Sequence, residues 1–573
     1  MSARLHVRPL ALLALSLGAA AQSTTRVSVS SSGAEGNQFS EAPSISLDAT
    51  RVAFSSIAST LVPNDTNNFD DVFVRDRSSG VTLRVSVSSS GAQSDGTSWE
   101  PALSADGRVV AFRSGATNLD PLDTNGVADV YVHDLTTGTT ARVSVASSGA
   151  QANGSSSTPA LSADGRYVAF YSTASNLVAG DTNGFWDIFV HDRQAHTTLR
   201  ASLTSSGAQP SNNCGGPALS ADGRYVAFHS NAANLVPGDT NASADIFVRD
   251  LLLSTTTRVS LTSLGVQANG SSADPQLSAD GRFVVFHSAA TNLAPSDTNL
   301  REDVFVHDRQ LGTTARVSVA TGGAEADSTS RKARISADGR VIAFESLAQN
   351  LDASDNNNTW DAFVHDRLSG VTERVSVDDQ GVEGDGTSSL PSISGTGRYV
   401  AFSSYASNLV AFDLNNTADI FVRDRGAEQP VAYCTAGTTS AGCVPAIGAS
   451  GTPSAAASSG FTLTVSALEG QRAGLLFYGT SGSSAWPWAA SSTSFMCVKQ
   501  PTQRLPLQNS GGTSAACNGA FASDFLAFMA ANPSALGQPL TPGATFYAQA
   551  WFRDPPAAKS TNLSNALMFT LVP

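Results

Sequence analysis

Short apolar segments separated by polar turns recur along residues 22–429 at a constant spacing. In one unit, four such segments predict strands at 101–104, 109–114, 130–134 and 141–145. The second and third are apolar at nearly every position, which is typical of strands buried on both faces. The fourth, which reads Arg-Val-Ser-Val from Arg142, alternates and predicts an outer strand with one wet face. This gradient of apolarity predicts a four-stranded propeller blade with its first strand innermost.

The repeat has a fixed length and a fixed number of copies. The segment Asp-(Val/Ile/Ala)-(Phe/Tyr)-Val-(Arg/His)-Asp occurs seven times at steps of 58 residues, without insertion or deletion. Such a period is typical of a fold built from one supersecondary unit. The fourth-strand pattern also has seven copies, but the first, at Arg26, precedes any complete unit, and the last unit lacks one. We therefore expect an all-β, seven-bladed β-propeller whose N-terminal strand completes the last blade. A right-handed solenoid is the alternative, and it leaves that N-terminal strand unexplained.

The repeat resembles a known group. The run from Pro101 to Arg108, then Val110 to Phe112, then Asp129 to Asp134, is similar to the WD40-like (PD40) repeat of TolB-type propellers, over about residues 24–425. This resemblance implies the propeller fold. The TolB protein that names the group is a periplasmic protein-interaction component with six blades behind an α/β domain. Here seven repeats directly follow the leader, so we do not expect the Tol-system role.

Residues 1–21 have the pattern of a signal peptide, with Arg4 and Arg8 ahead of an apolar run at 10–17 and small residues at 19–21. We expect an exported protein, located in the periplasm, outside the cell or at its surface. No later stretch approaches the roughly 18 uninterrupted apolar residues of a membrane span.

Acidic residues are concentrated in the repeats. Residues 22–429 hold 45 of the 48 acids but only 27 of the 34 bases. This excess disfavours nucleic acid and anionic lipid as partners and favours cations or basic partners. The alternative is that the charge only keeps a polar surface soluble. We expect a monomeric propeller.

The repeats stop before residue 430. Residues 430–460 predict a Gly/Ala/Ser/Thr-rich linker, and the strands that follow predict a small β-sandwich at 461–573. Four cysteines, Cys434, Cys443, Cys497 and Cys517, lie in this part, and an even set in an exported protein predicts disulfides. Three connectivities are possible, and we favour the local pairs, 434 with 443 and 497 with 517. Metal ligation is the alternative, but this part has no C-x-x-C pair and no His. The fifth cysteine, Cys214, is expected to be a free thiol.

A pattern of Asp, any residue, Asn, three residues and Asp closes each loop between the second and third strands. Oxygen ligands at positions 1, 3 and 7 are part of a calcium loop, so Ca²⁺ is a candidate cofactor, although position 5 and the distant Glu of an EF-hand are missing. The alternative is an Asx-turn whose side chains cap main-chain N–H groups. The candidate metal ligands are Asp65, Asn67, Asp71, Asp123, Asn125, Asp129, Asp181, Asn183, Asp187, Asp239, Asn241, Asp245, Asp297, Asn299, Asp303, Asp355, Asn357, Asp361, Asp413, Asn415 and Asp419.

Loop length predicts which face of the ring binds a partner. The turns between strands one and two and between strands three and four are tight, whereas the other two connections are long and emerge on one face. The last-but-one position of the second strand is occupied by five different residue types in the seven blades, which indicates a surface that reads a ligand. In blade six, a basic run from Arg331 replaces the usual Ser/Pro-rich segment, and repeat drift is the alternative to an anion site there. The candidate binding residues are Trp99, Arg113, Tyr171, Trp186, His229, His287, Arg301, Arg331, Lys332, Glu345 and Trp360.

Enzyme motifs are absent from the sequence: it contains no G-x-S-x-G, H-E-x-x-H, P-loop or Rossmann glycine pattern in a suitable context. We expect a non-catalytic binding or scaffolding protein with a protein or glycan partner. The alternative is a secreted polysaccharide hydrolase or lyase, which requires two carboxylates in one blade that the other blades lack. Glu345 is the only suitable candidate for one of these two carboxylates.

Overall fold

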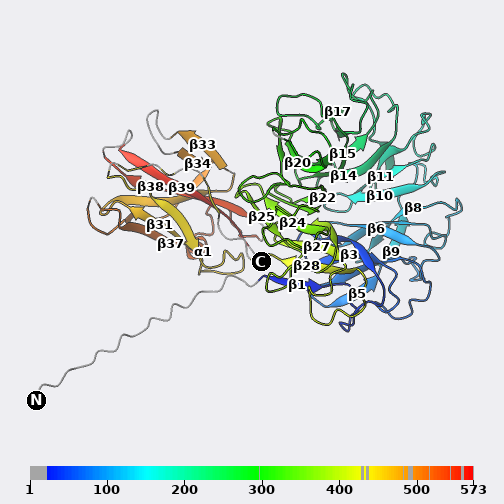
Figure 1. Cartoon of the computed structure of the whole chain (residues 1–573), viewed down its shortest axis with the longest axis horizontal. Coiled ribbons are helices and arrows are strands. Elements are labelled where there is room, and N and C mark those ends of the chain that lie inside the picture. Colours follow the sequence, from blue (N-terminus) through cyan, green and yellow to red (C-terminus); the bar gives the residue numbers. More distant parts are fainter. Residues whose placement is uncertain are drawn as a thin grey trace, which may run out of the picture.

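The computed structural model describes residues 22–571 except 296, 427–430, 434, 435, 437, 440, 482, 488–494, 515, 542, 543 and 556–559. The predicted signal peptide lies outside this range. Figure 1 shows a ring of small sheets from blue to yellow and a separate C-terminal β unit in orange and red. No helix among the described residues is long and apolar enough to span a membrane.

The ring consists of seven four-stranded antiparallel sheets, which confirms the predicted propeller. The first strands are β2 (Ser40–Ile45), β6 (Ser98–Leu103), β10 (Ser156–Leu161), β14 (Cys214–Leu219), β18 (Ser272–Leu277), β22 (Ser330–Ile335) and β26 (Ser388–Ile393). The second strands are β3 (Arg51–Ser56), β7 (Val109–Ser114), β11 (Tyr167–Ser172), β15 (Tyr225–Ser230), β19 (Phe283–Ser288), β23 (Val341–Ser346) and β27 (Tyr399–Ser404). The third strands are β4 (Asp71–Asp76), β8 (Asp129–Asp134), β12 (Asp187–Asp192), β16 (Asp245–Asp250), β20 (Asp303–Asp308), β24 (Asp361–Asp366) and β28 (Asp419–Asp424). The fourth strands are β5 (Val81–Arg84), β9 (Thr139–Arg142), β13 (Thr197–Arg200), β17 (Thr255–Arg258), β21 (Thr313–Arg316), β25 (Val371–Arg374) and β1 (Ser23–Arg26).

The core lies between blades and is built from the apolar second and third strands. In blade one, Phe54 and Phe73 are fully buried and their ring centroids lie 5.9 Å apart. Every blade has the same aromatic pair, with Tyr131 in the third-strand place in blade two. Side chains of each blade pack against those of the next, as Ala53 and Val72 do against Phe112. Burial of both faces explains why these strands read as continuous apolar runs.

The N-terminal strand closes the ring. β1 pairs with β28 in antiparallel register, with Arg26 opposite Phe421. The Thr24 hydroxyl donates to the Val377 carbonyl oxygen of blade six at 2.5 Å. An equivalent threonine makes the same inter-blade bond in each of the other six blades. The closing blade is therefore joined to its neighbour as the other blades are.

A second ring of hydrogen bonds circles the axis at the short-turn face. Main-chain N–H groups of the first turn of each blade donate to the carbonyl of the next blade, in the cycle Leu47, Ala105, Ala163, Ala221, Ala279, Ala337, Gly395 and back to Leu47. Neighbouring hydrogen-bonded chains lie about 4.8 Å apart, so seven of them enclose a circle with a radius of about 5.5 Å to the backbone. The axis is consequently narrow at this face, and the long loops surround its other end.

The first strands begin three residues earlier than predicted, because each contains a β-bulge. In blade two, Trp99 lies opposite Arg113 and Ala102 opposite Ala111, so one extra residue is accommodated between them. The bulge places Glu100 at φ 56°. Pro101 follows and is tolerated because a bulged position makes no ladder bond.

The fourth strands are edge strands with alternating exposed and buried positions, as predicted, but they end earlier than predicted, and the Arg-Val-Ser-Val segment itself does not have a wet face. β9 ends at Arg142, and Arg142, Val143 and Ser144 are all buried. The Ser144 hydroxyl donates to Asp129 Oδ1 at 2.5 Å and accepts the Val130 N–H. A buried serine that bonds a carboxylate therefore gives the same alternation of polar and apolar residues in the sequence as a serine that faces solvent.

The C-terminal unit has two main sheets around one core, which contains Leu463, Phe521, Tyr478 and Phe546. One sheet has the order β29-β39-β38-β32-β35, with β36 beside β32, and the other has the order β30-β31-β37. The elements are β29 (Val431–Tyr433), β30 (Ala446–Ser450), β31 (Thr462–Leu468), β32 (Ala473–Gly479), β33 (Ser483–Pro487), β34 (Phe495–Val498), β35 (Thr502–Arg504), β36 (Gln508–Asn509), β37 (Gly519–Asp524), α1 (Phe525–Ala531), β38 (Thr545–Arg553) and β39 (Thr561–Thr570).

The predicted local disulfide pairs are wrong, because Cys443 is bonded to Cys517 with a Cα–Cα distance of 5.4 Å. β30 and β37 both pair antiparallel with β31, so they start at the same end of that sheet. Each cysteine lies just before one of these starts, and the sheet brings the two together. Cys497 is buried in β34, and Cys434 lies outside the described residues. Cys214 is a buried free cysteine, as predicted.

Candidate functional site

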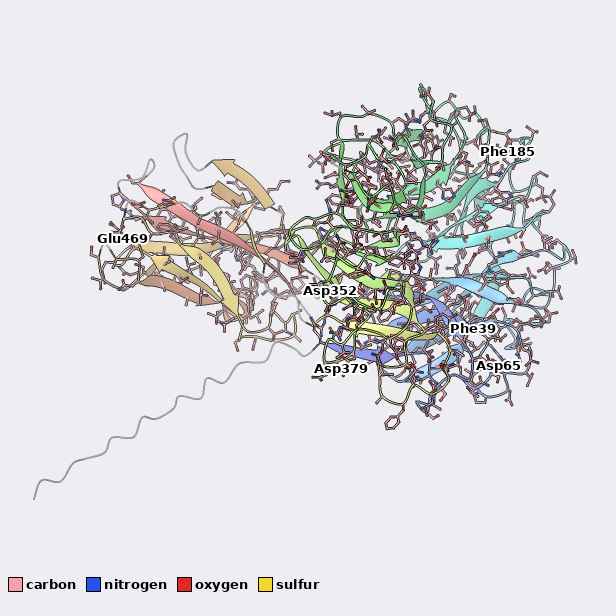
Figure 2. The ribbon with its side chains drawn as sticks, in the orientation of Figure 1. Phe39, Asp65, Phe185, Asp352, Asp379 and Glu469 are labelled. Carbon is pink, nitrogen blue, oxygen red and sulfur yellow. A yellow bond between two sulfur atoms is a disulfide. The ribbon has the colours of Figure 1, made fainter. Side chains whose placement is uncertain are left out.

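Each Asp/Asn loop is folded around an arginine from the end of the fourth strand. In blade one, Arg84 Nη1 lies 3.1 Å from Asp65 Oδ1 and 3.5 Å from Asp71 Oδ2. The same ion pairs recur in all seven blades, from Arg26, Arg84, Arg142, Arg200, Arg258, Arg316 and Arg374. We call each group of two aspartates and one arginine an Arg–Asp node. Figure 2 shows Asp65, of the first node, at the outer edge of the ring.

The asparagine of each loop forms an Asx-turn. Asn67 Oδ1 accepts the Phe69 N–H at 3.2 Å, and its Nδ2 donates to Asp71 Oδ2 and to the Ser94 carbonyl, both at 3.0 Å. The turn bond is present in every blade. The asparagine oxygen is therefore already used by the main chain, and an arginine lies between the aspartates. This geometry favours the Asx-turn over the calcium loop, and calcium binding stays a prediction for experiment.

A fourth residue divides the nodes into two classes. It is Gln93, Gln151, Gln209 and Gln267 in blades one to four, and Glu325, Glu383 and Glu35 in blades five to seven. In the second class three carboxylates surround one guanidinium, and their oxygens lie within 4.8 Å of one another. Asp297 is the least satisfied, because its buried oxygens accept no hydrogen bond among the described residues.

The extra carboxylate has an electrostatic effect. Burial, followed by the charge of the second aspartate, raises the pKa of Asp355 and of Asp413 to about 7 and that of Asp297 to about 6. The charges of Glu383, Glu35 and Glu325 add to these shifts. Blades five to seven therefore hold buried carboxyls that change charge near neutral pH.

A second set of residues surrounds the axis at the long-loop face. Four residues in each blade belong to this set, and we call them the mouth positions. They are the two bulge residues of the first strand, the last-but-one residue of the second strand and the residue before the third strand. Antiparallel register brings these positions to one end of each blade. In blade order, the second-strand members are Ser55, Arg113, Tyr171, His229, His287, Glu345 and Ser403, opposite Glu41, Trp99, Ser157, Gly215, Ala273, Arg331 and Ser389.

Three blades have aromatic stacks at their mouth positions. The Arg113 guanidinium lies 4.4 Å from the Trp99 ring centroid in blade two, and that of Arg331 lies 4.3 Å from Trp360 in blade six. In blade three, Tyr171 and Trp186 stack with centroids 5.4 Å apart. Trp186 keeps 45% of its surface exposed. These rigid, partly exposed rings are typical of binding anchors.

Mouth residues of adjacent blades also contact one another. Lys332 Nζ donates to Asp274 Oδ2 at 2.6 Å, across blades six and five. Burial alone raises the pKa of Asp274, but the Lys332 ammonium lowers it to about 2. Burial lowers the pKa of His229 and His287, and the buried Nδ1 of each has no hydrogen-bond partner among the described residues. A Cβ at Gly216 would lie 2.9 Å from His229, so glycine leaves room for that ring.

The structure gathers all but one of the predicted binding residues at the mouth positions. The exception is Arg301, which precedes the mouth residue Glu302 and has an exposed side chain. Sequence reasoning missed Glu100 and Asp274, which share the bulge position with Lys332. A proline directly follows this bulge position in six blades. Aligning the repeats on that proline would have identified Glu100 and Asp274 as equivalent to Lys332.

No family model and no curated protein matches the chain. Among solved structures, an oligogalacturonate lyase in complex with manganese is 12% identical with a TM-score of 0.43, and the match covers 71% of this chain and 94% of the lyase. TolB from Acinetobacter baumannii is 15% identical with a TM-score of 0.31, over 52% of this chain and 61% of TolB. A prolyl endopeptidase is 13% identical with a TM-score of 0.42, over 75% and 54%. These are distant likenesses to propeller-containing proteins, and they carry no inference about activity.

Proposed function

We propose that the chain is an exported, non-catalytic binding or scaffolding protein whose mouth positions bind a protein or glycan partner. One observation carries the proposal: the mouth positions differ from blade to blade on a scaffold that otherwise repeats its core pairs and its nodes. A repeated scaffold gains nothing in stability from such variety, whereas an asymmetric ligand requires it. The opening around the ring axis is also narrow at the short-turn face, so the long-loop face offers more room for a partner.

Export through residues 1–21 is part of this proposal. The Cys443–Cys517 disulfide supports it, because disulfides persist in oxidising compartments.

The polysaccharide hydrolase or lyase is less well supported. Glu345 Oε1 accepts the Arg331 Nε–H at 2.8 Å, and its Oε2 accepts the Leu390 N–H at 2.8 Å. Both oxygens of the best acid candidate are therefore used by the protein itself. An acid that is fully bonded in this way is poorly placed to protonate a leaving group.

A glycan array, together with an activity screen on the same polysaccharides, tests the proposal. We expect binding without turnover. Trp186→Ala or Trp360→Ala should weaken binding by more than about 1 kcal/mol. The controls are Arg108→Ala and Arg166→Ala in the tight turns of the opposite face, which should leave binding unchanged. Turnover of a bound polysaccharide, or loss of binding only in the two controls, would contradict the proposal.

A further inference from the structure

The basic run that begins at Arg331 in blade six contains three charged residues, and their surroundings differ. Arg331 donates to Glu345 Oε1 at 2.8 Å, and Lys332 donates to Asp274 Oδ2 at 2.6 Å. Arg334 has no ion pair among the described residues, and its guanidinium makes one hydrogen bond, to the carbonyl oxygen of the preceding residue at 3.0 Å. Two of the three positive charges are therefore paired, and that of Arg334 is not.

Arg334 is the fifth residue of a first strand, a place that we call the axis position because it lies beside the ring axis. The first strands are innermost, and those of adjacent blades contact one another. In blade one, the Ser46 N–H donates to the Arg51 carbonyl, so by ladder alternation the Ile45 N–H points away from β3 and toward the axis. It donates to the Ser392 hydroxyl of the preceding blade at 3.1 Å. A side chain at the axis position thus reaches the inner edge of the next blade.

Blade six is the one blade with a charge at the axis position. The seven residues are Ser44, Ala102, Ala160, Ala218, Gln276, Arg334 and Ser392. The scaffold therefore forms without a charge at this place. Removing a charge from water costs free energy unless an opposite charge or several hydrogen bonds compensate it. Repeat drift gives no reason to keep an unpaired arginine here, whereas binding of an anion does.

The surroundings of Arg334 leave an excess of positive charge. Burial lowers the pKa of Arg334, and the charges of Asp274 and Glu345 oppose that shift. These two acids are already bonded to the other two bases of the run. The group therefore contains three bases and two acids, and one positive charge remains for a ligand.

The main chain adds a second donor beside Arg334. In two blades, a serine at the axis position accepts an inward-pointing N–H of the next blade, as Ser44 does from Leu103 at 3.0 Å. The equivalent N–H in blade seven is that of Ile393, and the axis position before it is held by Arg334. An arginine side chain has donors only, so it cannot replace the serine oxygen. The junction of blades six and seven therefore combines a guanidinium and a main-chain N–H, and neither supplies an acceptor to the other.

We propose that Arg334 binds a small oxyanion at the ring axis, between blades six and seven. The ligand group is a carboxylate, a phosphate or a sulfate, because each offers several oxygen acceptors to a guanidinium and a main-chain N–H. The axis is narrow at the short-turn face, so the oxyanion enters from the long-loop face. The inference goes beyond the proposed function, because such a site does not need a partner at the mouth positions.

Calorimetric titration of the purified protein with sodium malonate, sodium phosphate and sodium sulfate, in a chloride-free buffer, tests the inference. We expect at least one probe to saturate a single site, and the probe that binds most tightly identifies the oxyanion as carboxylate, phosphate or sulfate. Arg334→Gln should weaken that binding by about tenfold or more, because it removes a charge-assisted hydrogen bond. Glutamine already occupies the axis position of blade five, so the variant introduces no new shape. Arg334→Lys keeps the charge and should weaken binding less than Arg334→Gln.

Two other arginines serve as matched controls. Arg113, at the mouth of blade two, also has no ion pair among the described residues; it lies over the Trp99 ring, and its Nε is buried without a partner. Arg108 lies in the tight turn of the opposite face. Arg113→Gln and Arg108→Gln should bind the probes as the unmodified protein does, and melting curves of all variants exclude misfolding as a cause.

If no probe saturates a site, or if Arg334→Gln binds the tightest probe as well as the unmodified protein does, the inference is wrong and the proposed function stands. Loss of binding in Arg113→Gln together with full binding in Arg334→Gln would place the oxyanion at the mouth of blade two, which would also overturn it.

Discussion

Glu383→Gln should change the stability of the protein more favourably at pH 8 than at pH 5. At pH 8 the blade-six node holds three carboxylates and one guanidinium, so Glu383 is repelled by two charges and attracted by one. Each carboxylate neighbour within 4.8 Å repels Glu383 by about 1 to 3 kcal/mol for effective dielectric constants between about 80 and 20, and the ion pair of Glu383 with Arg374 at 2.5 Å offsets part of this repulsion. Glutamine already occupies this place in four blades, so the change introduces no new shape.

The pH dependence follows from the pKa of Asp355, which is about 7 in the folded protein and about 3.9 in the unfolded chain. The folded state holds the proton more tightly, so unfolding releases it between about pH 4 and pH 7. The stability contributed by this group is present below pH 4 and is lost as the pH rises through 7. The variant should lose less stability over this window, because its aspartates have one negative neighbour fewer.

Urea unfolding followed by circular dichroism at pH 5, 6, 7 and 8 measures the effect. The triple variant Glu35→Gln, Glu325→Gln, Glu383→Gln should add the three gains, because the nodes belong to different blades. The converse changes, Gln93→Glu and Gln209→Glu, should destabilise the protein above pH 7. A triple variant that differs from the unmodified chain equally at pH 5 and pH 8 would refute this electrostatic account.

Three further predictions concern closure, metal and the disulfide. Deleting residues 23–30 should lower stability by about 3 kcal/mol or more, since it removes β1 and its node from the last blade, and an unchanged melting temperature would argue against closure by this strand. If the loops bind calcium, millimolar Ca²⁺ should raise the melting temperature of chelated protein, and Asp181→Asn with Asp187→Asn should reduce the rise; an unchanged curve leaves only the Asx-turn. Cys517→Ser should destabilise the C-terminal unit by about 4 kcal/mol, because it opens a loop with a sequence separation of 74, and equal urea midpoints would show that the bond contributes nothing.

Much of the propeller could be predicted because its second and third strands are marked locally. The bounds 109–114 were predicted without error, and those at 130–134 missed one residue, Asp129. The fourth strand was harder, since the partner of Ser144 is the buried Asp129, and a serine that turns inward looks like one that faces water. The disulfide depended on the order of β30, β31 and β37, which cysteine spacing does not encode. At the mouth positions, the alignment of the repeats identified the equivalent residues of the second strands. It did not show that Arg113 lacks a counter-ion, because that depends on three-dimensional contacts.

The pairing of β1 with β28 also dictates when the ring is finished. The partner of Thr25, Val422, is synthesised almost 400 residues later, and bringing the ends of such a loop together costs about 5 kcal/mol of chain entropy. Until then the outer edge of β28 is open and β1 is unpaired. At a high concentration of chains whose ring is still open, β1 of one molecule can pair with β28 of another molecule as well as with its own. Slow, concentration-dependent refolding with exchanged N-terminal strands is therefore the characteristic failure expected of this architecture.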